Sequence, residues 1–447
     1  VTAARSADAV GDAVRAALPG AAGWIRGRGW DQTRWAHDAF PDHRPLTAAA
    51  PHRPVCLRRV DGHAVWANAA AMAAAGVGAQ TPDPPGGLIL RDAAGQPTGV
   101  FLDEAMALVE RAAPAPTDGE VTRWVRSALG ALHRAGITGV HDPGATAQMV
   151  RVYRQLAAQG ELPLRVHVLL DDNDPAIAPL LAAGPAPDPW VAVRGVKLFS
   201  DGALGSCGAW LHHPYSDRPD QTGIPIVVGA ALRAKVRAHG AAGFQLAVHA
   251  IGDRAATEVL DAFEAAGVTP AHRWRIEHAQ IVRPLDQARM ARLGVLGLVQ
   301  PTHATSDHRW ATARLGARRV RTAYAWQSMA RAGVRLALGS DCPIEAPAAV
   351  AGLVAAVTRR DAQGPPPEGW LTSEALSRRD ALWGFTVGSA YAGFTEHRRG
   401  RVAVGFDADL TALSGDPLDP LEDLAALQVR GVCVGGVWHP ACEATPA

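Results

Sequence analysis

Short apolar runs alternate with amphipathic segments between about residues 118 and 395 of this 447-residue chain. Seven runs read as strand candidates: 137–142, 162–170, 193–202, 244–253, 273–282, 296–303 and 334–341. The segments between them, including 120–136, 229–241, 254–267 and 284–294, carry apolar residues at helical spacing. Short strands alternating with helices predict an α/β fold, with a parallel sheet whose faces are covered by helices.

Polar residues gather where these strand candidates end. Lys197, His249, His278, His303 and Asp341 each follow a separate apolar run. Side chains that converge from so many strand ends favour a (β/α)₈ TIM-type barrel, whose active site lies at that rim. An open doubly wound sheet also places its site there but needs fewer contributing strands. The chain supplies seven of the eight strands, so the first strand is expected to be missing.

The flanking regions differ from this alternation. Residues 24–112 are rich in Pro, Trp and turn residues. We therefore expect residues 1–117 to contain the start of the barrel region and an inserted cap over the barrel mouth. Residues 118–395 would form the barrel itself. The strand-like stretches in 396–447, with glycine turns, predict the C-terminal strands of a small, partial β-sandwich domain.

Composition and charge narrow the class of partner. Apolar residues make up 48% of the chain and charged residues 19%, with a formal net charge of +1. This balance gives no electrostatic case for nucleic acid or an anionic membrane as a partner. The five cysteines are odd in number and widely spread, which indicates reduced thiols and a cytoplasmic location. A homodimer is left open.

Two histidines and one aspartate at strand ends suggest a metal site. His249, His278 and Asp341 offer imidazole nitrogen and carboxylate oxygen, the usual ligands of Zn²⁺ and similar ions. A single strand-end histidine is more often structural, but three such residues at equivalent positions favour a metal. The expected cofactor is one or two divalent ions, with Zn²⁺ preferred.

Lys197 is one of only two lysines in a chain with 44 basic residues. A free ammonium is a poor partner for a metal cation, because both are positive. A lysine amine that has added CO₂ becomes a carbamate, whose oxygens can bridge two ions, and arginine cannot undergo this change. The alternative is that Lys197 pairs with Asp201 or binds substrate directly.

Several motifs resemble one known family. The stretches GVKLFSDGALGS, HAIGD, RIEHAQ, QPTHATSD and GSDCPIEAP, together with RRVDGHAVWANAAAM, are similar to the YtcJ-like branch of the metal-dependent amidohydrolase superfamily. N-substituted formamide deformylase belongs to this branch. The resemblance implies a (β/α)₈ barrel, a small β-sandwich built from both chain ends, and a hydrolase that cleaves an amide or related C–N bond with metal-activated water.

The same resemblance implies roles for individual residues. Lys197 would be the carboxylated, bridging ligand, and His249 and His278 would bind the second metal. Asp341 would complete the ligand set and act as the general base. It would take a proton from water and pass it to the leaving nitrogen.

Six further residues are candidate substrate contacts. They lie in the predicted cap or just after strand candidates: His63, Asn68, Asp201, Gly202, His303 and Asp307. Each has a structural alternative, namely packing of the cap, a simple turn or a surface loop.

The chain departs from the family at one point. The family's first strand ends in His-x-His, and no such pair occurs here. The missing pair, the seven-strand count and the initial valine together predict that an N-terminal segment is lacking, which leaves activity of this chain uncertain. A metal-dependent esterase or lactonase on the same barrel remains an alternative. A non-catalytic small-molecule-binding protein on a decayed barrel is another.

Overall fold

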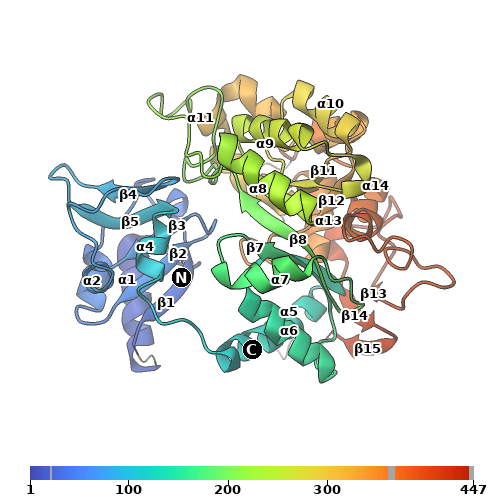
Figure 1. Ribbon diagram of the computed structural model, residues 1–447, viewed down its shortest axis with the longest axis horizontal. Coiled ribbons are helices and arrows are strands. Elements are labelled where there is room, and N and C mark those ends of the chain that lie inside the picture. Colours follow the sequence, from blue (N-terminus) through green and yellow to red (C-terminus); the bar gives the residue numbers. More distant parts are fainter. Residues whose placement is uncertain (21–22, 361–367, 442–447) are drawn as a thin grey trace. The chain divides into compact units, whose positions relative to one another are not determined.

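The computed structural model of the protein describes residues 1–20, 23–360 and 368–441 (Figure 1). The chain divides into two compact units. The first consists of Val1–Pro116, Asp201–Val227 and Trp310–Gly316, and the second of Thr117–Ser200, Val228–Arg309 and Ala317–Ala447. The two later segments of the first unit fold with the first 116 residues, which the apolar pattern did not predict.

The first unit contains a five-stranded sheet that the sequence analysis did not predict. Its strands are β1 (Ile25–Trp30), β2 (Val55–Arg59), β3 (Ala64–Ala67), β4 (Gly87–Arg91) and β5 (Pro97–Asp103), in the order β1-β2-β3-β5-β4. Only the β1–β2 pair is parallel. The helices are α1 (Ala7–Ala17), α2 (Arg44–Ala49), α3 (Ala69–Ala74) and α4 (Met106–Glu110). Glycine and arginine inside β1 interrupt the apolar alternation, which explains why that strand was missed.

Tryptophan rings form much of the core of this unit. Trp30 and Trp66 are fully buried and meet edge to face at 5.8 Å between ring centroids. Trp35 lies 6.2 Å from Trp66. Such tilted contacts are the arrangement that aromatic rings prefer. These tryptophans therefore stabilise the sheet by packing.

The second unit contains the predicted parallel sheet. Its strands are β6 (Gly139–Ala145), β7 (Arg165–Asp171), β8 (Val191–Phe199), β9 (Gln245–Ala250), β10 (Arg275–His278), β11 (Leu296–Val299) and β12 (Leu336–Leu338). They pair in chain order and all in parallel. All seven predicted strands are confirmed. Within the described residues β6 and β12 do not pair with each other, so the curled sheet is a half-barrel and not a closed one.

Helices follow the strands along the chain (Figure 1). They are α5 (Asp118–Arg134), α6 (Ala147–Ala158), α7 (Ala178–Ala183), α8 (Gly229–Ala241), α9 (Asp253–Ala265), α10 (Pro284–Leu293), α11 (Pro301–Arg319), α12 (Trp326–Arg331), α13 (Ala349–Thr358), α14 (Arg378–Trp383) and α15 (Ser389–Ala392). The predicted helices at 120–136, 229–241, 254–267 and 284–294 correspond to α5, α8, α9 and α10. Thr117 and Glu120 form a capping box that starts α5.

The C-terminal strands form one three-stranded antiparallel sheet. β13 (Leu410–Leu413), β14 (Val429–Val434) and β15 (Val437–Pro440) pair in that order. Gly435 and Gly436, with φ of 59° and 85°, make the two-residue turn between β14 and β15. Within the predicted strand region 396–447, the described residues before β13 contain no strand, so the prediction is confirmed in part. Residues 442–447 lie outside the described part.

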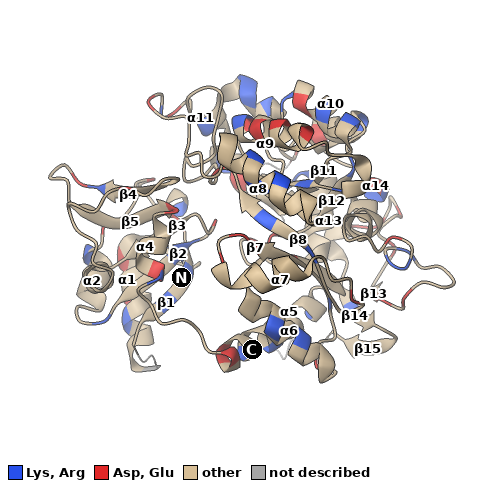
Figure 2. Ribbon diagram, in the orientation of Figure 1, with Lys and Arg blue, Asp and Glu red and all other residues tan. Residues whose placement is uncertain are grey.

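Two general properties complete the description. Basic and acidic residues are interspersed along the chain (Figure 2). Among the described helices, none combines the length and the apolar composition that crossing a lipid bilayer requires.

Candidate metal centre

The candidate ligands lie at the carboxyl ends of parallel strands in the second unit. Lys197 precedes the last two residues of β8, and His249 lies near the end of β9. His278 is the last residue of β10, and Asp341 follows β12 by three residues. Register pairs Phe199 with His249 and His249 with Glu277. Because the strands are parallel, these ends lie along one edge of the sheet.

Two of the candidate ligands, together with His303, come close enough to share an ion. The ligand atoms of His278, His303 and Asp341 all lie within 4.8 Å of one another. His303 Nε2 is 3.8 Å from Asp341 Oδ2, and the His278 and His303 rings stack at 5.9 Å. Two imidazoles and one carboxylate make a donor set that suits Zn²⁺ and related divalent ions. The residues therefore fit a metal.

His303 had been expected to contact substrate. It lies in the first turn of α11, after the end of β11, and the helix directs it towards the strand ends. The apolar pattern had predicted that residues 296–303 form a strand, with a surface loop around His303 as the alternative. The signal that could have identified it is the apolar run ending in Gln300-Pro301, since proline often begins a helix.

His249 and Lys197 extend the row of side chains. The His249 ring centroid lies 4.5 Å from that of His278 and 5.5 Å from that of Phe199. Lys197 Nζ lies 4.7 Å from the centre of the Phe199 ring. Both His249 and Lys197 are buried. Contacts of this length connect Lys197 to the three clustered side chains through Phe199 and His249.

The orientation of His278 is set by a glutamine. His278 Nδ1 lies 2.9 Å from Gln300 Oε1, and Gln300 Nε2 donates to the Leu298 carbonyl at 3.2 Å. The second hydrogen bond fixes which end of the amide faces the ring, so Nδ1 is the donor. The neutral imidazole then keeps its lone pair on Nε2, the form that binds a metal.

A buried ion pair lies on the same sheet face as Lys197. Arg275 Nε is 2.6 Å from Glu277 Oε1, and Arg275 Nη1 is 2.8 Å from His141 Nδ1. Burial lowers the pKa of Lys197; Glu277 and Asp341 counteract this and Arg275 adds to it. The sequence analysis overlooked Arg275 and Glu277, although two charges two residues apart in an apolar strand share one face.

His63, Asp201 and Gly202 belong to the first unit. His63 Nδ1 lies 2.7 Å from Asp103 Oδ1, and Asp201 Oδ2 accepts from the Trp210 amide at 2.8 Å. A Cβ at Gly202 would come within 2.6 Å of Asp103 Oδ2, so only glycine fits. Burial is the largest single influence and opposes charging of His63, but the hydrogen bond to Asp103 and the charges of Asp103, Asp61 and Asp201 together outweigh it and raise the pKa of the imidazole.

Asn68 and Asp307 have clear structural contacts. The Asn68 amide donates to the Ala50 and Arg53 carbonyls and accepts from two backbone amides, one of them in α3. It is the N-cap of that helix. Asp307 accepts a hydrogen bond from Tyr324 Oη at 2.7 Å.

The parallel α/β sheet and the strand-end donors define a class, the metal-dependent hydrolases. The chain belongs to the amidohydrolase family, which its sequence matches over residues 3–438. It is 34% identical over 420 residues to the putative amidohydrolase YtcJ of Bacillus subtilis, covering 92% of this chain and 79% of that protein. The expected family resemblance is thereby confirmed, and the protein is a hydrolase.

Two further proteins support this assignment. N-substituted formamide deformylase of Arthrobacter pascens is 31% identical, with 93% of this chain and 78% of that protein covered. A crystal structure of an uncharacterized metal-dependent hydrolase from Pyrococcus horikoshii superposes with a TM-score of 0.75 at 28% identity, covering 93% of this chain and 81% of the other. The deformylase supports the amidohydrolase family, and the Pyrococcus horikoshii structure supports a metal-dependent hydrolase fold.

Proposed function

We propose that the protein hydrolyses an amide or related C–N bond at a divalent metal centre built on His278, His303 and Asp341. The observation that carries the proposal is the approach of their ligand atoms to within 4.8 Å of one another. When bound, a divalent ion such as Zn²⁺ supplies Lewis acidity towards a carbonyl oxygen and makes water more acidic. The similarity to N-substituted formamide deformylase supports a C–N bond as the target.

Asp341 is the proposed general base. Its carboxylate is partly exposed and lies 3.8 Å from His303, so it can contact both the cluster and an incoming water. It would accept the proton of the attacking water and return it to the leaving nitrogen. A leaving amine needs this proton because an unprotonated amide anion is too basic to depart.

Lys197 and His249 are proposed to extend the site to a second ion. Carboxylation of Lys197 joins its amine nitrogen to CO₂ and releases one proton, which gives a carbamate with two donor oxygens. The support is positional: Lys197 ends β8 beside Phe199 and His249, on the face that carries the buried Arg275–Glu277 pair. Among the basic side chains, only lysine has a nucleophilic amine that can take this role.

Other parts of the prediction remain proposals. His63, Asp201, Gly202 and Asp307 are proposed substrate contacts; for Asn68 the observed contacts favour its capping role. We further propose that the half-barrel belongs to a complete (β/α)₈ barrel with a β-sandwich, as in the family. A small amide-like substrate, a cytoplasmic location and a homodimer complete the proposal. Neither nucleic acid nor a membrane is included as a partner.

The test compares hydrolysis and metal content in one preparation. Asp341→Asn should keep the fold and lower kcat by at least roughly 10²-fold, the scale of a lost general base. Asp8→Asn, at an exposed aspartate in α1, is the matched control. Substrates would be an N-substituted formamide series and matched esters. Near-normal amide turnover by Asp341→Asn with full metal content would overturn the role, and hydrolysis of the esters alone would overturn the C–N assignment.

A further inference from the structure

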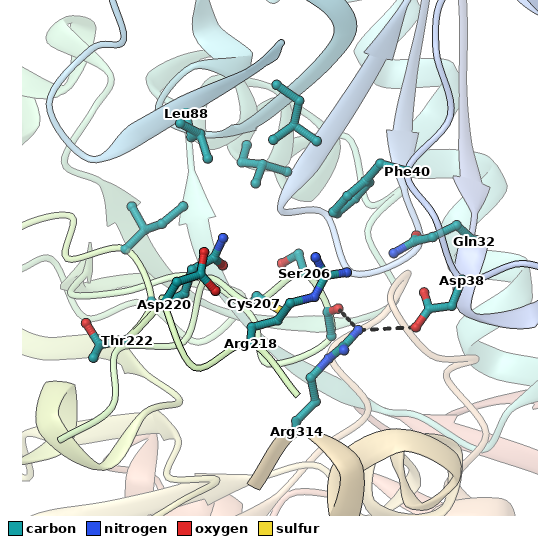
Figure 3. A pocket seen from close by; sticks show the side chains of 16 residues that line it. Gln32, Asp38, Phe40, Leu88, Ser206, Cys207, Arg218, Asp220, Thr222 and Arg314 are labelled. Atoms are coloured by element: carbon teal, nitrogen blue, oxygen red, sulfur yellow. Dashed lines mark hydrogen bonds and ion pairs between the residues drawn. The ribbon is translucent and has the colours of Figure 1, made fainter. Parts of the chain in front are cut away.

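A cavity of about 390 Å³ lies within the first unit (Figure 3). All its lining residues come from the three segments of that unit. One wall is apolar and consists of Phe40, Leu88, Leu90, Leu102 and Ile224. This volume and this kind of wall are typical of pockets that take small organic molecules. The cavity shares no residue with the metal centre.

Buried polar groups form the opposite wall. Arg314 is only 5% exposed, and its guanidinium contacts Asp217, Asp38 at 3.5 Å and the Gly205 carbonyl at 3.3 Å. Its Nε is buried and has no hydrogen-bond partner among the described residues. Ser206, 3% exposed, also lines the cavity. This wall of the cavity is therefore built from polar groups held in fixed positions by the contacts of Arg314.

Arg218 supplies a second guanidinium. In Figure 3 its side chain extends between the apolar side chains and Arg314. Its guanidinium forms no side-chain hydrogen bond or ion pair within the described part of the chain. The charge of Arg314 is balanced by Asp38 and Asp217, whereas that of Arg218 is not balanced in this way.

The segment that carries Arg218 is held in place by its own backbone. Leu211 N donates to Thr222 O at 2.7 Å, and Ile224 N donates to Gly208 O at 2.8 Å. Gly223 has φ of 96°, and a Cβ there would lie 2.0 Å from the Ala209 carbonyl oxygen. The cavity is therefore formed before any ligand arrives, which reduces the entropic cost of binding.

We propose that this cavity binds a small amphipathic carboxylate. The carboxylate accepts hydrogen bonds from the Arg218 guanidinium, and the apolar body packs on Leu88 and Phe40. A cationic ligand fits less well, because the Arg218 guanidinium can only donate. Asp220, at the cavity, is exposed and remains solvated when an anion binds. The proposal is independent of the hydrolytic function.

The test measures binding of 4-phenylbutyrate to the full chain by titration calorimetry. The unchanged protein should bind 4-phenylbutyrate more tightly than 4-phenylbutan-1-ol, 4-phenylbutylamine or acetate. Arg218→Gln should weaken binding roughly tenfold, the scale of one hydrogen bond to a charged group. Leu88→Asp, which places a negative charge in the apolar wall, should weaken it as well. Arg233→Gln removes an equally exposed charge from α8 and should change nothing.

Three results would overturn the proposal. One is failure of 4-phenylbutyrate to bind at millimolar concentration. Another is equal affinity of the alcohol and the carboxylate, because the guanidinium would then contribute nothing. The third is unchanged binding in both Arg218→Gln and Leu88→Asp, which would place the carboxylate elsewhere, for example at the metal centre.

Discussion

His278 and Asp341 both adopt left-handed backbone torsions, with φ of 69° and 57°. Residues other than glycine rarely occupy this region, and they do so at a cost of about 1–3 kcal/mol where the surroundings enforce it. The two residues also belong to the cluster with His303. Two of the three residues whose side chains converge therefore have strained backbones. Strain of this kind is expected at a site selected for chemistry and not for stability.

His303 provides the first prediction at this scale. If it is a metal ligand and not only a substrate contact, His303→Ala should lower the metal content of the purified protein and not merely raise KM. His397→Ala, at an exposed histidine, serves as control and should leave metal content unchanged. Metal is counted per chain by atomic emission. If His303→Ala keeps its full metal content and only KM increases, His303 contacts substrate and is not a metal ligand.

Lys197 provides the second prediction at the scale of the residue. Lys197→Arg keeps a positive charge but cannot form a carbamate, so both metal content and turnover should fall. Lys235→Arg is a matched control, since Lys235 is the other lysine and pairs with Asp172. Short carboxylic acids should partly restore turnover to Lys197→Ala by supplying the missing oxygens. Unchanged metal content and activity in Lys197→Arg would rule out carboxylation.

At the scale of the element, β10 carries a buried charged pair followed by a candidate metal ligand. Arg275 and Glu277 share one face of the strand, His278 ends it, and all three are buried. Arg275 lies 2.6 Å from Glu277 and 2.8 Å from His141. A buried ion pair contributes little net stability, yet removal of one partner leaves the other charged and unpaired in a dry interior.

Substitutions of Arg275 and Glu277 should therefore have non-additive effects on the free energy of unfolding. Arg275→Met should destabilise the protein by about 3–5 kcal/mol, because Glu277 loses its counter-ion. The double variant Arg275→Met/Glu277→Leu should recover most of that loss. Urea unfolding measures both. Equal destabilisation by the single and double variants would mean that side-chain packing, and not charge pairing, holds this part of β10.

At the scale of the whole molecule, two interior histidines, the buried His167 and the partly buried His141, couple stability to pH. His141 and His167 lie 4.6 Å apart between ring centroids, and His167 Nε2 is 3.0 Å from Gln245 Oε1. Burial and the nearby Arg275 charge lower the pKa of His167 to about 3. Burial, His167 and Arg275 lower the pKa of His141 well below its usual value. Both rings are therefore neutral in the folded protein near neutral pH.

The pH prediction follows from the sign of these shifts. An unfolded imidazole has a pKa of about 6.5, so between that value and about 3 the unfolded state binds more protons. The free energy of unfolding should thus fall as pH drops through this window, by about 2 kcal/mol from His167 alone between pH 7 and 5. His167→Gln should reduce this slope. The free energy of unfolding is measured by urea titration at pH 7 and pH 5. The same difference between the two pH values in His167→Gln and in the unchanged protein would contradict the prediction.

The sequence alone determined the parallel sheet and the set of polar strand ends. Seven apolar runs of strand length between amphipathic helices allow few other folds, and a histidine or lysine that ends such a run must lie at the carboxyl edge. The sequence also indicated the amidohydrolase family, because motifs such as RIEHAQ and GSDCPIEAP occur in the expected order.

Tertiary structure alone decided which of these side chains meet. His303 approaches Asp341 because α11 begins at Pro301 and because Asp341 has a left-handed backbone torsion. A loop after β11, which the sequence suggested, would not fix this approach. The five-stranded sheet of the first unit pairs neighbouring strands within the first segment of the chain, as Ile25 with Val55, and its cavity brings together residues as distant in sequence as Gln32 and Arg314. Sequence periodicity reports local structure and burial, whereas such pairings are selected by the packing of the complete chain.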